Sequence, residues 1–194
     1  MPTMSRFESA FCRSAPWRFV ARRIVLPWAL QGVQPVGEVL EIGAGSGAMA
    51  ADLLATYPAV TMTVSDFDPQ MVAVAGQRLT GFADRVTVRQ ADATALPFED
   101  ETFDLVVSWI MLHHTVEWEK ALAEAVRVVR PGGRVVGYDL LSRLPLRALH
   151  QAEGARFRMM SFGELREAVR GLPVTQAILC PGLAGFVVRF TLQK

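Results

Sequence analysis

A glycine-rich turn is the first part of this sequence whose spacing suggests ligand chemistry. Residues 39–47 read VLEIGAGSG, an apolar run that leads into Gly43, Gly45 and Gly47, and residues 48–57 then have the small and apolar composition of a helix. Glycines let a backbone approach a ligand closely at such a strand-to-helix turn. The pattern alone does not identify the ligand, because the same stretch through Ala48 also satisfies the dinucleotide fingerprint of nicotinamide enzymes.

Acidic residues near the ends of three apolar runs narrow the choice of ligand. Glu41 lies within the first run, where an ionised carboxylate is costly unless it meets a ligand ammonium or the amides of the turn; a solvated strand end or a cap for the turn is the alternative. Asp66 ends the second run and could accept both hydroxyls of a ribose, with the Phe67 ring beside it for adenine. Asp68 is predicted to cap a helix. Asp92 follows the third run and could accept from an adenine amino group.

The elements that must position these residues alternate between strand and helix. Apolar and β-branched runs predict strands at residues 36–42, 60–65, 85–90, 103–108 and 134–139, and helices at 48–57, 69–79 and 118–129, the last broken by Pro-Gly-Gly at 131–133. This order implies parallel strands joined by helical crossovers. The sequence therefore predicts an α/β fold with a doubly wound, mostly parallel seven-stranded sheet, helices on both faces, and the three acids at its carboxyl edge.

The two ends of the chain depart from this alternation. A helix at 162–170 is followed by strand-like runs at 174–179 and 186–192, which could pair as a C-terminal antiparallel hairpin around a Pro-Gly turn at 180–185. Residues 1–35 mix arginines with aromatic residues at helical spacing and predict an N-terminal helical arm or lid, with Pro27 at a kink or a helix end. Residues 36–194 would form the ligand-binding domain, and the whole chain one globular unit.

Composition limits the partners and the location that we expect. The 194 residues carry a formal net charge of +1, which lacks the strong basic field of a nucleic-acid-binding protein. Basic flanks surround an acidic middle and could face an anionic substrate or a membrane surface, or could be solvated helix faces. Cys12 and Cys180 supply neither a disulfide framework nor zinc spacing, so we expect a cytoplasmic location and no metal. No apolar run approaches the roughly 20 residues that span a bilayer.

Four motifs together resemble those of the class I S-adenosylmethionine-dependent methyltransferases, in particular the small-molecule group typified by ubiquinone and menaquinone biosynthesis (methyltransferase type 11). They are VLEIGAGSG at 39–47, VSDFDPQM at 64–71, ADATALPFEDETFDLVVS at 91–108 and RVVRPGGRVV at 127–136. The resemblance covers residues 36–139 and implies a Rossmann-like fold, with S-adenosyl-L-methionine as cofactor and S-adenosyl-L-homocysteine as product. The cofactor-binding residues that it implies are Glu41, Gly43, Ala44, Gly45, Gly47, Asp66, Phe67, Asp92, Ala93 and, through its backbone, Ser108.

The same resemblance places the loop at 109–115 beside the transferable methyl group. If the acceptor is a hydroxyl or an acidic carbon, His113 is the predicted general base, with His114 next to it, because histidine titrates near neutral pH. Both histidines could instead shape the loop by hydrogen bonding. Candidates for the acceptor pocket, each of which could equally be a packing or surface residue, are Trp17, Tyr138, Arg143, Arg147, His150, Met159 and Met160.

The predicted function is direct in-line transfer of a methyl group to a small-molecule acceptor, which requires no protein nucleophile. The alternatives are a non-catalytic module that binds S-adenosylmethionine and, less favoured, a nicotinamide-dependent oxidoreductase. Nucleic acid is a disfavoured acceptor, because residues 108–111 read SWIM in place of the Asn-Pro-Pro-Tyr type of motif associated with amino methylation of a flipped base. The acceptor, the methylated atom and the oligomeric state stay open.

Overall fold

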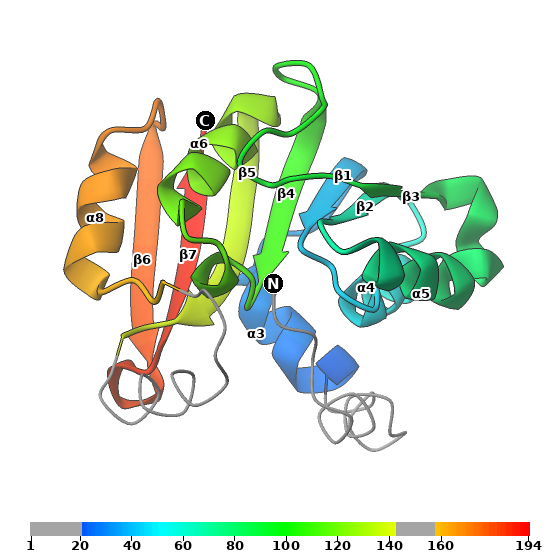
Figure 1. Ribbon diagram of the computed structural model, residues 1–194, viewed down its shortest axis with the longest axis horizontal. Helices are drawn as coiled ribbons and strands as arrows, with labels where there is room; N and C mark the ends of the chain where they lie inside the picture. The colour runs from blue at the N-terminus through cyan, green and yellow to red at the C-terminus, as the bar shows by residue number, and fades with distance from the viewer. Residues whose placement is uncertain (1–20, 143–157) are drawn as a thin grey trace.

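Short runs of branched aliphatic residues form the strands of one sheet. In the computed structural model, which describes residues 21–142 and 158–194, this sheet has seven strands in the order β3-β2-β1-β4-β5-β7-β6 (Figure 1). Strands β1 to β5 pair in parallel, and β7 runs antiparallel between β5 and β6. The strands are β1 Gly37–Ile42, β2 Val60–Asp66, β3 Val86–Gln90, β4 Phe103–Trp109, β5 Val129–Leu140, β6 Gln176–Gly182 and β7 Val187–Gln193. The predicted doubly wound sheet with a C-terminal hairpin is confirmed.

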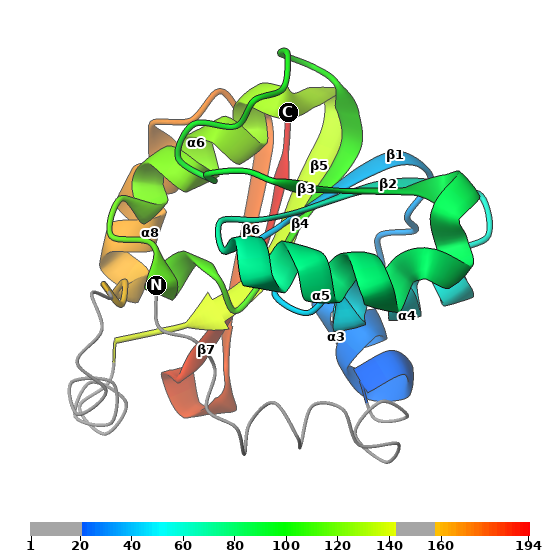
Figure 2. The ribbon, with the colours of Figure 1, turned by 45° about the vertical axis from the view of Figure 1, so that its right-hand side comes forward.

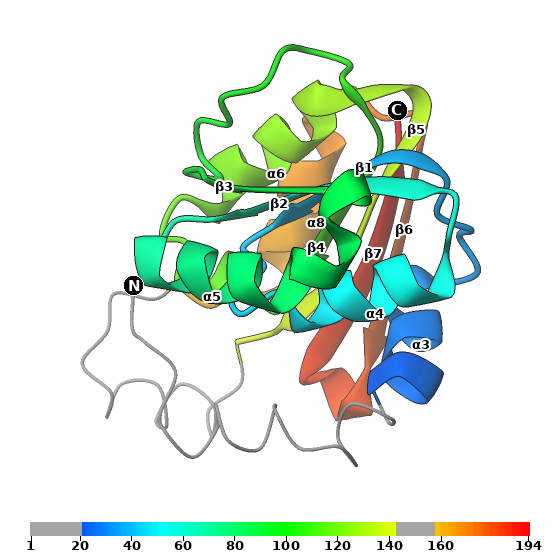
Figure 3. The same cartoon turned by 90° about the vertical axis from the view of Figure 1, so that its right-hand side faces the viewer.

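Helices cover both faces of the sheet, as predicted. The α3, α4 and α5 helices lie on one side, and α6 and α8 lie on the other (Figure 2 and Figure 3). Their bounds are α3 Leu26–Leu30, α4 Ala48–Thr56, α5 Pro69–Leu79, α6 Trp118–Val128 and α8 Phe162–Arg170. The side chain of Asp68 accepts a hydrogen bond from the backbone N–H of Gln70 at 2.8 Å, which confirms it as the cap of α5.

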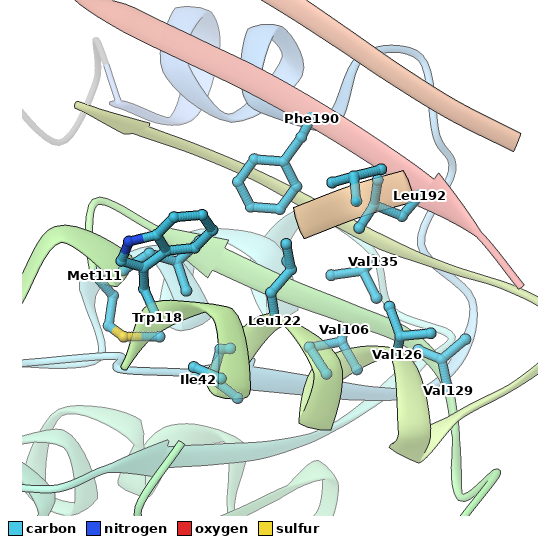
Figure 4. Packing of buried hydrophobic residues seen from close by; sticks show 14 of the residues in the cluster. Ile42, Val106, Met111, Trp118, Leu122, Val126, Val129, Val135, Phe190 and Leu192 are labelled. Atoms are coloured by element: carbon cyan, nitrogen blue, oxygen red, sulfur yellow. The ribbon is translucent and has the colours of Figure 1, made fainter. Parts of the chain in front are cut away.

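The central strands are buried on both faces, because each helical layer packs against the sheet. Between the sheet and the α6–α8 layer lie large side chains such as Trp118, Leu122 and Phe190 (Figure 4). Neighbouring residues of β1 alternate between the layers, with Leu40 facing α6 and Val39 facing the α3–α5 side. Burial on two sides fixes the position of these strands and therefore of the residues at their ends.

Residues 131–133 were predicted to separate a helix from the next strand, but they belong to the strand itself. The α6 helix ends at Val128 and β5 begins directly at Val129, so the Pro-Gly-Gly segment lies inside the strand. Its pairing with β4 shifts register there, from the pair Phe103–Val129 to the pair Leu105–Arg134. The extra residues of β5 are therefore accommodated as a bulge at the start of the strand pair.

The hairpin turn is shorter than the predicted 180–185. Strand β6 continues through Gly182, and the turn is confined to the short helix Leu183–Gly185 and the residue after it. Pro181 can lie inside β6 because an edge strand has one side that needs no backbone N–H donor.

The described part of the predicted N-terminal arm packs onto the sheet. A π-helical turn, Ala21–Val25, leads into α3, whose Leu26, Ala29 and Leu30 are buried in the same layer as α4. Pro27 does not end a helix, since it lies in the first turn of α3, where its missing N–H leaves no bond unmade. Residues 1–20 lie outside the described residues, and the division at residue 35 stays a prediction.

The packing of α6 generates a stability prediction. Leu122 is 1% exposed, so L122A should lower the free energy of unfolding by about 2–5 kcal/mol through lost burial and a residual cavity. Urea unfolding measures this loss. The matched control is V74A on α5, where a side chain that is 40% exposed should change stability by less than about 0.5 kcal/mol. Equal losses in the two variants would contradict the burial assigned to α6.

Candidate functional site

The glycine turn joins the end of β1 to α4, and its glycines serve different purposes. Gly43 has φ +66°, and a side chain there would overlap that of Met111 from the loop after β4. Gly45 has φ +53° and no atom within 4 Å of the place where a side chain would start. Gly47 precedes α4 and lies against Ala75 of α5. Gly43 and Gly47 are thus needed for close packing, whereas Gly45 borders open space in which a ligand could lie.

Asp66, at the end of β2, is tied to this turn. Its Oδ2 accepts from the backbone N–H of Gly45 at 2.7 Å, and its Oδ1 accepts from the backbone N–H of Asp68 at 2.9 Å. An ionised carboxylate has about four acceptor positions, so further donors can still bind. A second tie, from Arg78 Nη1 to Ser46 Oγ at 2.6 Å, was not foreseen from the sequence, where Arg78 is one of several helix arginines.

Glu41 is the unusual group at this edge. It lies on the same face of β1 as Val39, is 1% exposed, and its Oε2 has no hydrogen-bond partner. Burial, together with the smaller effect of the negative charge of Asp66, raises the pKa of Glu41 to about 8. Without a cation nearby, this carboxyl group therefore keeps its proton near neutral pH, as expected of a buried acid that lacks a partner.

The residues predicted for the adenine side meet at the ends of β2 and β3. The backbone N–H of Ala91 donates to the Asp66 carbonyl at 3.0 Å, and Gln90 Nε2 donates to the Phe67 carbonyl at 2.9 Å. Phe67 is 48% exposed. Asp92 is exposed and uses Oδ1 to accept from the backbone and hydroxyl of Thr94, at 2.9 and 2.8 Å.

Two further predicted cofactor residues take different positions at this edge. Ala93, which follows Asp92, is half-buried. Ser108 is buried one residue before the end of β4, where it pairs with Ile42 and Gly137. Strand β4 was predicted to end at Ser108, and in the structure it continues for one more residue, to Trp109.

The loop after β4 is fastened to the end of β5. His113 lies in a short helix, Leu112–His114, and is 1% exposed, with Nδ1 at 2.6 Å from Asp139 Oδ1. The ring of His114 lies 4.0 Å away, centroid to centroid. In the sequence, Asp139 is only the last residue of a predicted strand. The signal that could have found it is an acid at the end of the fifth strand facing a histidine pair after the fourth.

The described candidates for the acceptor pocket are buried. Tyr138 packs between Trp28 and Trp109, with ring centroids 5.2 and 5.7 Å away, and Met159 and Met160 are enclosed near the loop after β5. The other candidates, Trp17, Arg143, Arg147 and His150, lie outside the described residues. Within residues 21–142 and 158–194, no group of three or more His, Cys, Asp or Glu side chains could hold a metal ion. No helix of that part of the chain has the length and apolar character needed to cross a membrane.

Comparison with known proteins separates the two enzyme classes that the glycine turn allows. A family described as "Methyltransferase domain" matches residues 39–133. The chain is 31% identical over 168 residues to the demethylmenaquinone methyltransferase of Thermus thermophilus, an alignment that covers 79% of this chain and 76% of that protein. The chain belongs to the class I S-adenosylmethionine-dependent methyltransferases. This methyltransferase is also 41% identical over 121 residues to the demethylmenaquinone methyltransferase of Clavibacter sepedonicus, covering 62% of this chain and 45% of that protein.

Solved structures agree with the fold of this methyltransferase. It aligns with phosphoethanolamine N-methyltransferase 2 of Haemonchus contortus with a TM-score of 0.76 and 16% identity, over 98% of this chain and 60% of that one. It aligns with the CurJ carbon methyltransferase with a TM-score of 0.73 and 16% identity, over 96% and 58% of the two chains. The chain spans about half the length of the Clavibacter relative and about three quarters of the Thermus relative.

The raised pKa of Glu41 generates a prediction about stability. Between pH 4.5 and about 8 the unfolded chain has released this proton while the folded chain still holds it, so Glu41 lowers the free energy of unfolding as pH rises through that window. E41Q removes this dependence. The free energy of unfolding of the variant, relative to that of the wild type, should increase by up to about 1.4 kcal/mol per pH unit as pH rises through that window. Urea unfolding at about pH 5 and about pH 8 measures this difference.

The control for this measurement is S108A, which changes a buried but uncharged side chain at the same edge of the sheet. Its effect on stability should be equal at both pH values. A difference between E41Q and the wild type that is the same at both pH values would contradict the raised pKa.

Proposed function

We propose that this methyltransferase carries a methyl group from S-adenosylmethionine directly to a small-molecule acceptor and releases S-adenosylhomocysteine. The observation that supports it best is the buried carboxyl group of Glu41, whose Oε2 has no hydrogen-bond partner, on the strand that leads to the open space at Gly45. An acid in such a place is costly until a cation binds next to it. The amino acid part of S-adenosylmethionine carries an ammonium group of that kind, and the sulfonium supplies an activated methyl group.

The other groups at this edge fit the remaining parts of the cofactor. Asp66 keeps acceptor positions for the ribose hydroxyls, the exposed Phe67 ring offers a face to adenine, and Asp92 has Oδ2 available for the adenine amino group. The backbones of the glycine turn, with Gly43, Ala44, Gly45 and Gly47, and of Ala93 and Ser108 would complete the site.

The acceptor that we propose first is a quinone-type ring in its reduced form. The Thermus and Clavibacter relatives are named demethylmenaquinone methyltransferases, and a hydroquinone has an acidic hydroxyl and an electron-rich carbon. Both kinds of atom must lose a proton when they take a methyl group. We assign this proton to His113, which lies in a buried loop where water would not compete for it.

Cofactor identity is tested first, by calorimetric titration of the purified protein with S-adenosylmethionine and S-adenosylhomocysteine, with NADH and NADPH as controls. We expect micromolar affinity for the first pair alone. Binding of only a nicotinamide nucleotide would overturn the proposal. Binding of the first pair without turnover of any reduced quinone or related phenol would favour the non-catalytic module.

The role of Asp66 is tested by substitution. D66A should weaken binding of S-adenosylhomocysteine by roughly 1 to 3 kcal/mol, because hydrogen bonds from the ribose hydroxyls to a carboxylate are lost. D68A is the control in the same loop, because it removes the α5 cap and about 1 kcal/mol of stability while its backbone N–H still reaches Asp66. Calorimetry should give D68A the affinity of the wild type. An unchanged affinity in D66A would remove Asp66 from the site.

A further inference from the structure

We propose that the indole N–H of Trp109 binds the carboxylate of the amino acid part of S-adenosylmethionine, next to the ammonium group that Glu41 binds. This inference rests on the proposed function and adds a cofactor-binding residue that the sequence motifs did not indicate. Trp109 is the last residue of β4 and is 8% exposed. Its Nε1 is buried and has no hydrogen-bond partner among the described residues. A buried N–H without an acceptor costs free energy, so it marks a place where a ligand acceptor is needed.

Trp109 and Glu41 lie on the same face of neighbouring parallel strands. Glu41 pairs in register with Val107 of β4, and Trp109 lies two residues further along that strand, about 7 Å beyond this pair. Side chains two residues apart on a strand share a face, and Val107 and Trp109 are both buried in the layer between the sheet and α3, α4 and α5. The acid and the indole therefore leave the sheet on one side, near its carboxyl edge.

The two unpartnered atoms have opposite requirements. Oε2 of Glu41 needs a donor or a cation, and Nε1 of Trp109 needs an acceptor. The amino acid part of S-adenosylmethionine offers both groups on one carbon atom, since its ammonium donates and its carboxylate accepts. A carboxylate whose ammonium group is bound at Glu41 is held close to that acid. The two negative charges would repel each other unless a donor binds the ligand carboxylate.

The glycine turn offers this carboxylate few backbone donors. Three of its N–H groups already donate within the protein, those of Ala44, Gly45 and Gly47, at 3.0, 2.7 and 2.9 Å. The end of β4 can supply a donor instead, because it lies against the turn. A side chain at Gly43 would overlap that of Met111, which follows Trp109 by two residues. The indole N–H is thus an unused donor on the strand that borders the turn.

Aromatic packing holds the indole in place before a ligand binds. The Tyr138 ring lies against the Trp109 ring, with 5.7 Å between the centroids, and Trp28 of α3 packs edge-on against Tyr138 at 5.2 Å. The residue after Trp109 is fastened as well, since Ile110 donates its backbone N–H to the Tyr138 carbonyl at 2.9 Å. A donor held in this way binds a carboxylate with little further loss of side-chain freedom.

Calorimetric titration tests the assignment with two ligands that differ only in the carboxylate. They are S-adenosylhomocysteine, which has the same amino acid part as S-adenosylmethionine, and its decarboxylated analogue, which keeps the ammonium group. W109F should weaken binding of S-adenosylhomocysteine by about 10- to 100-fold, because a hydrogen bond to a charged group is lost, and binding of the analogue by less than about twofold. Equal losses for the two ligands, or an unchanged affinity for S-adenosylhomocysteine, would overturn the proposal.

W118F is the matched control for this titration. Trp118 also has a buried Nε1 without a partner, but it lies in the α6 layer, on the opposite face of the sheet. W118F should therefore bind both ligands with the affinity of the wild type. E41Q, in contrast, should weaken both ligands, since both carry the ammonium group. A loss of S-adenosylhomocysteine affinity in W118F as large as that in W109F would mean that the change acts through packing, which contradicts the proposal.

A second measurement leaves Trp109 unaltered. The chain contains four tryptophans, each of which gives one indole N–H signal in a proton–nitrogen-15 NMR spectrum of tryptophan-labelled protein. W109F assigns the signal of Trp109 by its loss; if this variant does not fold, W17F, W28F and W118F assign it by elimination. In the wild type, S-adenosylhomocysteine should move this proton signal downfield, as a hydrogen bond to a carboxylate does, and the decarboxylated analogue should not. A signal that responds equally to both ligands, or to neither, would overturn the proposal.

The outcomes separate this inference from the proposed function. If the wild type binds no S-adenosylhomocysteine, the proposed function and the role of Trp109 are both rejected. If the wild type binds it and W109F binds it equally well, the proposed function stands and the role of Trp109 alone is rejected. Both measurements report binding without methyl transfer, so neither depends on the identity of the acceptor.

Discussion

Burial of the central strands on both faces is the constraint on which the rest of the structure depends. Because β1, β4 and β5 are packed between two helical layers, their carboxyl ends cannot shift relative to one another without disturbing both layers. The glycine turn, the loop with His113 and the end of β5 leave the sheet at these fixed points. The glycine turn and the loop after β4 therefore lie so close together that a side chain at Gly43 would overlap that of Met111.

Asp139, Asp66 and Glu41, all at this edge, differ in how many of their oxygens already accept hydrogen bonds, and the difference indicates what each one does. Asp139 has donors on both oxygens and no exposure, so it is complete without a ligand. Asp66 has one backbone donor on each oxygen and can accept more. Glu41 has a buried oxygen without any partner. A complete group orients its neighbours, whereas an incomplete one marks a place where a ligand donor is needed.

Local signals in the sequence were sufficient for most of the fold. The spacing of apolar residues and the Asp-Pro start of α5 predicted that helix at its observed bounds, and Phe162–Arg170 was predicted equally well. The Pro-Gly segments were interpreted less well. Residues 131–133 break a helix in isolation, but in the sheet they form a bulge because the residues before and after them both pair with β4. Whether this segment breaks a helix or forms a bulge depends on its pairing with β4, which is distant in the sequence.

The candidate site divides in the same way. Glu41, Asp66 and Asp92 could be found because each lies at or near the end of its own strand, and the ends of parallel strands meet at one edge of a sheet. The pairing of His113 with Asp139 joins residues 26 positions apart. It depends on which residue of β5 the loop after β4 contacts, and no local sequence pattern determines that. Sequence could therefore name a histidine able to accept a proton, but the reason for its orientation lies in a carboxylate that only the folded chain brings to it.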